Sequence, residues 1–153
     1  MTFSRQMVMF FATGGFVGTL PLAPGTFGSL LGLPICFFLT QLPVTVSVIA
    51  IGLFVIAAVN IAGRAETVLN TRDPGCIVID EVAGQMVALI GLPFNFPVVM
   101  GGFLVFRCLD ILKPFPIGWL ERRLSGGIGI VADDILAGLM ANIIIRCIIV
   151  ILK

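Results

Sequence analysis

Residues 44–62 read VTVSVIAIGLFVIAAVNIA, an apolar run that contains no charged side chain. A helix needs roughly 20 apolar residues to cross the hydrocarbon core of a bilayer, and about 17 at the least. This run reaches that length, and so does a second apolar run over residues 130–152. The sequence therefore predicts two full helical spans and a membrane protein.

The composition supports the same interpretation. Hydrophobic residues make up 59% of the 153 residues and charged residues 11%, whereas soluble domains carry about 25% charged residues. We expect one all-α, multi-helical integral membrane domain over residues 1–153. Three shorter apolar runs predict partly re-entrant helices or a locally thin bilayer: residues 27–39, 77–92 and 97–112.

Several classes of chemistry are excluded by residues that are absent. A net charge of +1 without a long basic run indicates no nucleic-acid partner. The chain has no histidine, no cysteine followed by arginine six positions later, and no D-x-D triplet. Phosphohistidine, cysteine and haloacid-dehalogenase types of phosphatase are thereby ruled out. A hydrolase of this sequence would have to use Asp, Glu and a metal.

The basic residues predict the orientation. Most lie in the connections 63–76 and 113–129, and the turns at 41–43 and 93–97 have none. The positive-inside rule places the two basic connections in the cytoplasm. The apolar runs then alternate outward and inward, and the last leaves Lys153 outside. The stretch up to Leu20 is expected to enter from the cytoplasm as a re-entrant or interfacial helix.

Five carboxylates fall at the cytoplasmic ends of three predicted helices. Ionisable groups inside membrane segments are costly and face a partner or a polar cavity, and converging carboxylates repel one another unless cations neutralise them. Mg²⁺ prefers oxygen ligands and keeps several waters, so a few carboxylates suffice to bind it. The alternative is that these acids are helix N-terminal charges favoured by the helix dipole. The five are Asp80, Glu81, Asp110, Asp133 and Asp134.

Two of these acids share a spacing. Gly84 follows Asp80 by four residues, and Gly138 follows Asp134 by four. Positions i and i+4 lie on one helix face, and glycine there lets another backbone approach closely. The repeated Asp-to-Gly spacing predicts tight packing of two helices, which would bring two carboxylates close enough to share a metal. Residues 125–129 are expected to form a flexible lead-in to the last helix.

Two groups of residues are candidates for binding phosphate. Arg107, Asp110 and Lys113 are spaced by three along one side of a helix end, and the two cations could bind phosphate oxygens. The alternative is an Arg107–Asp110 ion pair with a snorkelling Lys113. The second group lies in a turn-rich segment that leads into the apolar run 27–39, where free backbone N–H groups at a helix start could bind an anion. The alternative is a re-entrant turn in which Thr26 or Ser29 is an ordinary N-cap. Its candidates are Gly25, Thr26, Gly28 and Ser29.

Four segments together resemble the phosphatidylglycerophosphatase A family. They occur in the family's order over most of residues 13–141, and Phe115 stands where members often have Trp. The segments are Gly25–Ser29, Ile77–Gly84, Phe106–Ile117 and Gly126–Gly138.

The resemblance implies a multi-pass, Mg²⁺-dependent enzyme of the bacterial inner membrane. It would hydrolyse phosphatidylglycerophosphate to phosphatidylglycerol and phosphate, with its active site facing the cytoplasm. The metal ligands would be Asp80, Glu81, Asp133 and Asp134, with Asp110 a further ligand or the general base. Arg107, Lys113 and the segment Gly25–Ser29 would hold the phosphate. The only partner expected is the phospholipid substrate, and the sequence predicts no particular oligomeric state.

Two other classes are the alternatives. A small ion or metal transporter would also carry acids in its helices, but it would spread them across membrane depth. A CDP-lipid phosphotransferase would also use metal, but its D-x₂-D-G-x₂-A-R string does not occur here.

Overall fold

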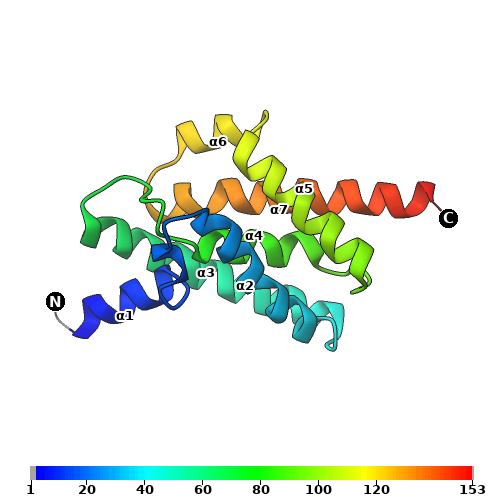
Figure 1. Cartoon of the computed structure of the whole chain (residues 1–153), viewed down its shortest axis with the longest axis horizontal. Coiled ribbons are helices and arrows are strands. Elements are labelled where there is room, and N and C mark those ends of the chain that lie inside the picture. The colour runs from blue at the N-terminus through cyan, green and yellow to red at the C-terminus, as the bar shows by residue number, and fades with distance from the viewer. Residues whose placement is uncertain (1–2, 153) are drawn as a thin grey trace.

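The computed structural model describes residues 3–152 and is entirely helical over that range, which confirms the all-α prediction (Figure 1). Lys153 lies outside the described residues, so its predicted location is untested. The described elements are α1 (Phe3–Ala12), the 3₁₀ turn η1 (Val17–Thr19), α2 (Pro24–Leu39), α3 (Val44–Leu69), α4 (Ile79–Leu89), α5 (Phe96–Leu112), α6 (Ile117–Arg123) and α7 (Gly126–Ile151).

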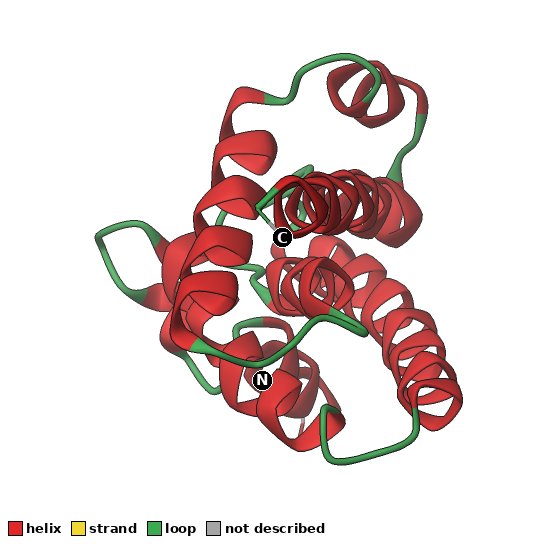
Figure 2. Ribbon diagram, turned by 90° about the vertical axis from the view of Figure 1, so that its right-hand side faces the viewer, coloured by secondary structure: helices red, strands yellow, loops and turns green. Residues whose placement is uncertain are grey.

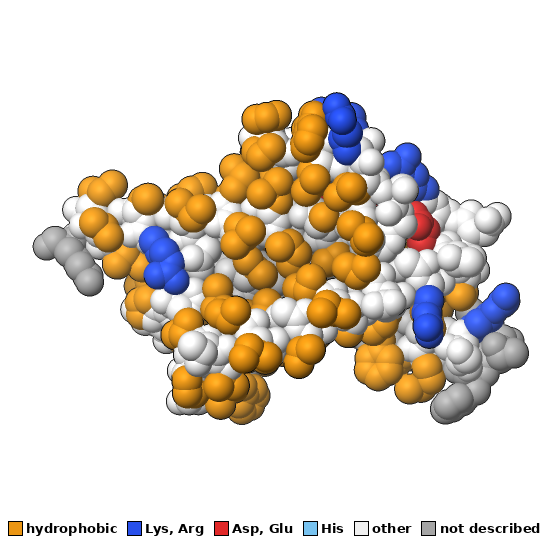
Figure 3. Space-filling model, turned by 180° about the vertical axis from the view of Figure 1, so that it is seen from behind, with side chains coloured by type: hydrophobic (Ala, Val, Ile, Leu, Met, Phe, Trp, Pro, Cys, Tyr) orange, Lys and Arg blue, Asp and Glu red, His pale blue; other side chains and the backbone are white. Residues whose placement is uncertain are grey.

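Two helices, α3 and α7, are long and apolar enough to cross a membrane, as the sequence predicts. Their outward faces are covered by large hydrophobic side chains, among them Ile49, Leu53, Ile143 and Val150. Figure 3 shows hydrophobic side chains over most of the face in view, with most of the visible Lys and Arg toward one end. These features indicate that the protein associates with a membrane.

The short helix α4 is the centre of the fold. All of its residues except Glu81 are buried, because α2, α3, α5 and α7 all pack against it. Figure 2 shows the described helices gathered into one bundle. Small residues let these neighbours come close: a Cβ on Gly84 would lie 2.8 Å from the carbonyl oxygen of Asp134. Asp80, at the start of α4, is therefore held inside the protein, and Glu81 beside it is partly buried.

The C-terminal end of α4 is joined to α7 by hydrogen bonds. The last carbonyls of a helix have no partner within the helix itself. The Asn142 amide donates to the carbonyl oxygens of Ala88 and Ile90, each at 3.0 Å, and Arg146 Nη2 also donates to Ile90 at 3.0 Å. Contacts of Gly84 with Gly138 and of Ala88 with Asn142 show that α4 and α7 run parallel.

Two predicted boundaries are wrong. The predicted flexible lead-in at 125–129 is helical from Gly126, because Gly127 packs on α3, where a Cβ would overlap the Val59 carbonyl oxygen. Helix α3 also continues to Leu69, beyond the end of its apolar run. The length of an apolar run indicates only the part of a helix that can lie in the hydrocarbon core, and the helix itself can continue beyond that core into water.

The N-terminal stretch packs over the segment that leads into α4. Helix α1 lies against α3, and the Val78 backbone N–H donates to the carbonyl oxygen of Ala12 at 2.9 Å. Gly18 approaches the Cys76 backbone so closely that a Cβ would overlap its carbonyl oxygen. The start of the chain thus supports the entry to α4, and its placement relative to a bilayer stays a prediction.

Candidate active site

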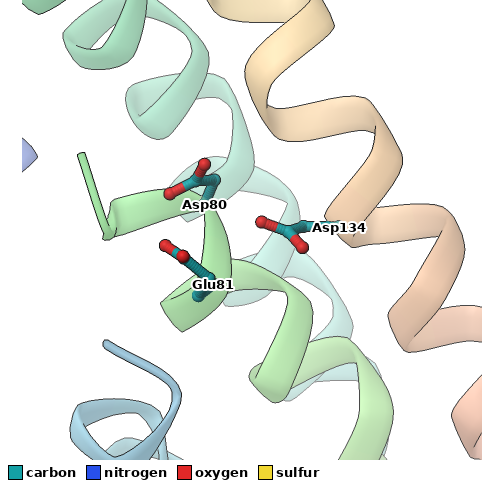
Figure 4. Close-up of side chains that lie close together, drawn as sticks. All are labelled: Asp80, Glu81 and Asp134. Carbon is teal, nitrogen blue, oxygen red and sulfur yellow. The ribbon is translucent and has the colours of Figure 1, made fainter. Parts of the chain in front are cut away.

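Three carboxylates from two helices meet where α4 begins (Figure 4). Asp80 and Glu81 stand in the first turn of α4, and Asp134 faces them from α7. One oxygen of each lies within 4.8 Å of the other two. Asp80 and Asp134 are buried, with 7% and 3% of their surface exposed. We call these three residues the acidic triad.

The triad forms because of two glycines. A Cβ on Gly138 would overlap the carbonyl oxygen of Gly84, so the two helix backbones touch there. Each glycine lies one turn beyond a triad residue, Asp80 on α4 and Asp134 on α7. The close packing predicted from the repeated spacing is confirmed, and it is this packing that holds the carboxylates together.

The triad carboxylates are not ion-paired among the described residues, and the nearby Arg107 is paired with Asp110. One oxygen of each carboxylate is buried without a hydrogen-bond partner: Asp80 Oδ1, Glu81 Oε2 and Asp134 Oδ1. Buried like charges destabilise one another unless a cation lies between them. An all-oxygen donor set with unused oxygens fits a hard divalent cation such as Mg²⁺.

Asp133 faces a different partner. Successive residues on a helix point about 100° apart, so Asp133 turns away from the triad and lies outside it. Its Oδ2 accepts a hydrogen bond from Lys113 Nζ at 2.7 Å, and Glu121 Oε1 accepts another at 2.7 Å. Burial alone would lower the pKa of Lys113, but these two hydrogen bonds outweigh it and raise that pKa above its ordinary value. Lys113 is therefore tied into the protein and does not snorkel.

The ion pair between Arg107 and Asp110 is present, as one of the two interpretations of their spacing required. Arg107 also reaches the triad, since a Cβ on Gly25 would lie 3.0 Å from its Nη2 and would overlap Glu81 Oε1. The Arg107 Nε is buried and has no partner among the described residues. A guanidinium with unused donors thus lies beside Glu81.

The segment Gly25–Ser29 is the first part of α2. Gly25 touches the triad, whereas Gly28 packs against Val78, and the buried Ser29 hydroxyl donates to the Gly25 carbonyl oxygen at 2.9 Å. Thr26 is partly exposed. The alternative interpretation, with Thr26 or Ser29 as N-cap, is wrong, because Ala23 takes that position in a left-handed conformation without a side-chain cap. Of the two glycines, Gly25 is the one that lies against a triad residue.

The helix-dipole interpretation accounts for only two of the five acids. Asp80 and Glu81 do lie in the first turn of α4. Helix α7 begins at Gly126, so Asp133 and Asp134 lie about two turns inside it and gain little from its dipole.

Sequence reasoning did not single out Glu121 or Gln85. Glu121 shares Lys113 with Asp133, and no spacing in the sequence indicates that contact between α6 and the end of α5. Gln85 is wholly buried and lies on α4, one helical turn after Glu81. A signal for it exists, since it is the polar residue within an apolar stretch four positions after Glu81.

The fold and the site define a class of protein: a helical, membrane-associated protein with a buried acidic site beside an arginine and a helix N-terminus. The family model described as phosphatidylglycerophosphatase A matches residues 10–149. The chain belongs to this family.

Individual relatives agree. The phosphatidylglycerophosphatase A of Escherichia coli K12 is 37% identical over 131 residues, which cover 85% of this chain and 76% of that protein. The Haemophilus influenzae protein of the same name is 34% identical over 136 residues, or 88% and 83%. A Bacteroides thetaiotaomicron protein named putative phosphatidylinositol-3-phosphatase is 34% identical over 142 residues, 87% of each chain. Among solved structures, none matches this chain.

Proposed function

We propose that this protein hydrolyses phosphatidylglycerophosphate to phosphatidylglycerol and phosphate, with Mg²⁺, at the cytoplasmic face of a bacterial inner membrane. The observation that carries the proposal is the acidic triad, whose carboxylates form no ion pair among the described residues and each keep one buried oxygen without a hydrogen-bond partner. The family and the names of two relatives support the reaction.

The triad residues Asp80, Glu81 and Asp134 would hold the cation. When bound, a divalent cation stabilises charge on phosphoryl oxygens and lowers the pKa of a coordinated water. Asp133 would act through Lys113, which it fixes next to the site by the 2.7 Å hydrogen bond. The buried position of the triad excludes bulk water, which strengthens every electrostatic interaction there.

Arg107 and the start of α2 would bind the phosphate. The guanidinium presents donors in a planar fork that matches phosphate oxygens, and its Nε is unused. The N–H groups at a helix N-terminus favour an anion, and Gly25 brings the N-terminus of α2 into contact with Glu81 and Arg107. A cation site and an anion site would thus adjoin, as hydrolysis of a phosphomonoester requires.

In the proposed reaction, the oxygen of a water forms a bond to phosphorus while the bond from phosphorus to the ester oxygen breaks. The departing glycerol oxygen takes a proton, and inorganic phosphate leaves. Asp110 is our candidate to accept the proton of the attacking water, because its ion pair with Arg107 holds it at the edge of the site.

The distribution of charge supports a cytoplasmic site in a multi-pass protein. Most cations lie toward the triad's end of the long helices, which the positive-inside rule assigns to the cytoplasm. Arg146, at the opposite end of α4, is an exception. The cations of the triad's end are Arg64, Arg72, Lys113, Arg122 and Arg123.

The test is phosphate release by the purified protein from a panel of phospholipids, with Mg²⁺ and with a chelator. The panel holds phosphatidylglycerophosphate, phosphatidic acid, a lysophospholipid and phosphatidylinositol 3-phosphate, the last because of the name of one relative. We expect Mg²⁺-dependent release that is fastest from phosphatidylglycerophosphate. Faster release from another lipid would correct the substrate, and undiminished release in the chelator would refute the metal site.

A further inference from the structure

Buried polar atoms without a hydrogen-bond partner are concentrated at one place in the described chain. Apart from Gln85, every residue that carries one is a charged residue of the candidate site. Gln85 has two such atoms, the oxygen and the nitrogen of its side-chain amide, and 0% of its surface is exposed. The charged residues are Asp80, Glu81, Arg107, Asp133 and Asp134.

Gln85 lies on the face of α4 that carries Glu81, one helical turn after it. Long side chains on a helix lean back toward its N-terminus, onto the preceding turn. For Gln85 that turn carries Glu81, whose Oε2 is also without a partner.

Packing fixes the stem of this side chain. A Cβ on Gly32 of α2 would lie 3.0 Å from Gln85 Cβ and 3.2 Å from its Cγ, so the stem lies directly against α2. The backbone carbonyl of Gln85 accepts from the Cys36 thiol at 3.7 Å. Since none of the Gln85 surface is exposed, its amide does not reach solvent to find a partner there.

Other buried polar side chains of this core do have partners. Asn142, the matching buried amide, donates to the C-terminal carbonyls of α4 and accepts from Arg146. The hydroxyls of Ser29 and Ser47 donate to backbone carbonyls. A buried amide without a hydrogen-bond partner is unfavourable, and a ligand bound in the site would supply the partner that Gln85 lacks.

We infer that Gln85 is a positioning residue of the acidic site. The amide of Gln85 hydrogen-bonds a water in the hydration shell of the divalent cation, and this water lies one helical turn further along α4 than Glu81. The inference rests on the proposed function, since it needs the cation. Mg²⁺ keeps several of its waters when it binds to protein, and hydrogen bonds from the surrounding residues orient such ligands and tune the affinity. An amide suits the role because it can donate and accept without adding charge.

The experiment compares wild type, Gln85→Met and Asn142→Leu in lipid nanodiscs. Binding of Mn²⁺, as a paramagnetic substitute for Mg²⁺, is titrated by electron paramagnetic resonance, and thermal unfolding is followed on the same samples. Gln85→Met keeps the length and removes the hydrogen-bonding atoms. It should weaken Mn²⁺ binding about 10–100-fold without lowering the unfolding temperature. Asn142→Leu should lower the unfolding temperature and leave Mn²⁺ affinity unchanged.

The outcomes separate the two proposals. If wild type binds no Mn²⁺, the metal site and the role of Gln85 both fall. If wild type binds Mn²⁺ and Gln85→Met binds it equally well, only the role of Gln85 is refuted. Should Gln85→Met fail to fold, Gln85→Asn is the second variant. It keeps the amide but withdraws it by one methylene, so it should also weaken binding, and wild-type affinity in Gln85→Asn would overturn the inference.

Discussion

Gly84 and Gly138 bring the backbones of α4 and α7 into contact, because a Cβ on Gly138 would overlap the carbonyl oxygen of Gly84. One turn before these glycines stand Asp80 and Asp134, two of the three triad carboxylates. The distance between the two acids is therefore set by the absence of side chains at two neighbouring positions. This contact links the packing of the helices directly to the chemistry proposed for the site.

Gly138→Ala should separate α4 from α7. Forcing a methyl group into a close-packed contact costs about 1–3 kcal/mol, and a displacement of about 1 Å at a site can reduce turnover roughly a hundredfold. We expect a lower unfolding temperature and a loss of Mg²⁺-dependent phosphate release of about a hundredfold. Gly52→Ala on α3 is the control, because nothing lies within 4 Å of its Cβ. Equal activity in the two variants would contradict this role of the contact.

Lys113→Met should destabilise the protein by leaving Asp133 buried without its partner. Removing one member of a buried ion pair costs about 3–5 kcal/mol, and the Asp133 side chain is only 6% exposed. Thermal unfolding measures the loss. The double variant Lys113→Met/Asp133→Asn should recover much of it, since the uncompensated charge is then absent.

Glu121→Gln serves as the comparison for that pair. The Glu121 side chain is 39% exposed, and exposed ion pairs contribute about 0–1 kcal/mol. Its effect on unfolding should therefore be small. A loss as large as that of Lys113→Met would show that Glu121, and not Asp133, is the partner that matters.

Gly25→Ala should impair the site with little effect on the rest of the fold. The added Cβ would overlap Glu81 Oε1 and lie 3.0 Å from Arg107 Nη2, so one of these flexible side chains must move. We expect a higher KM for the lipid and a higher Mg²⁺ requirement. Gly75→Ala is the control, since nothing lies within 4 Å of its Cβ. Unchanged kinetics in Gly25→Ala would separate the start of α2 from the phosphate.

Much of the fold could be predicted because its signals are local. The apolar run of residues 44–62 predicts a spanning helix, and the two Asp-to-Gly spacings predict the contact of α4 with α7, as found. The start of α7 could not be predicted from Gly126 and Gly127, because glycines are poor helix formers when isolated. Here Gly127 is helical because it packs against the backbone of α3.

The site was predictable in composition but not in its pairings. The sequence places the acids at the same end of three predicted helices, so it indicates that they lie near one another. Which acids face one another depends on how each helix is rotated about its axis. Asp133 and Asp134 are adjacent in sequence, yet one pairs with Lys113 and the other joins Asp80 and Glu81. Helix rotation depends on packing between elements distant in sequence, so Glu121 and Gln85 become evident only in three dimensions.

The central claim is that the acidic triad binds the cation on which phosphate release depends. The most direct measurement is Mg²⁺-dependent phosphate release from phosphatidylglycerophosphate by wild type, Asp80→Asn and Asp134→Asn in proteoliposomes. Glu66→Gln is the control, because Glu66 lies outside the triad and accepts from the Asp73 backbone N–H at 3.2 Å. We predict that both Asn variants insert and fold but release no phosphate above background, while Glu66→Gln keeps its activity. Full turnover by Asp80→Asn or Asp134→Asn would contradict the account.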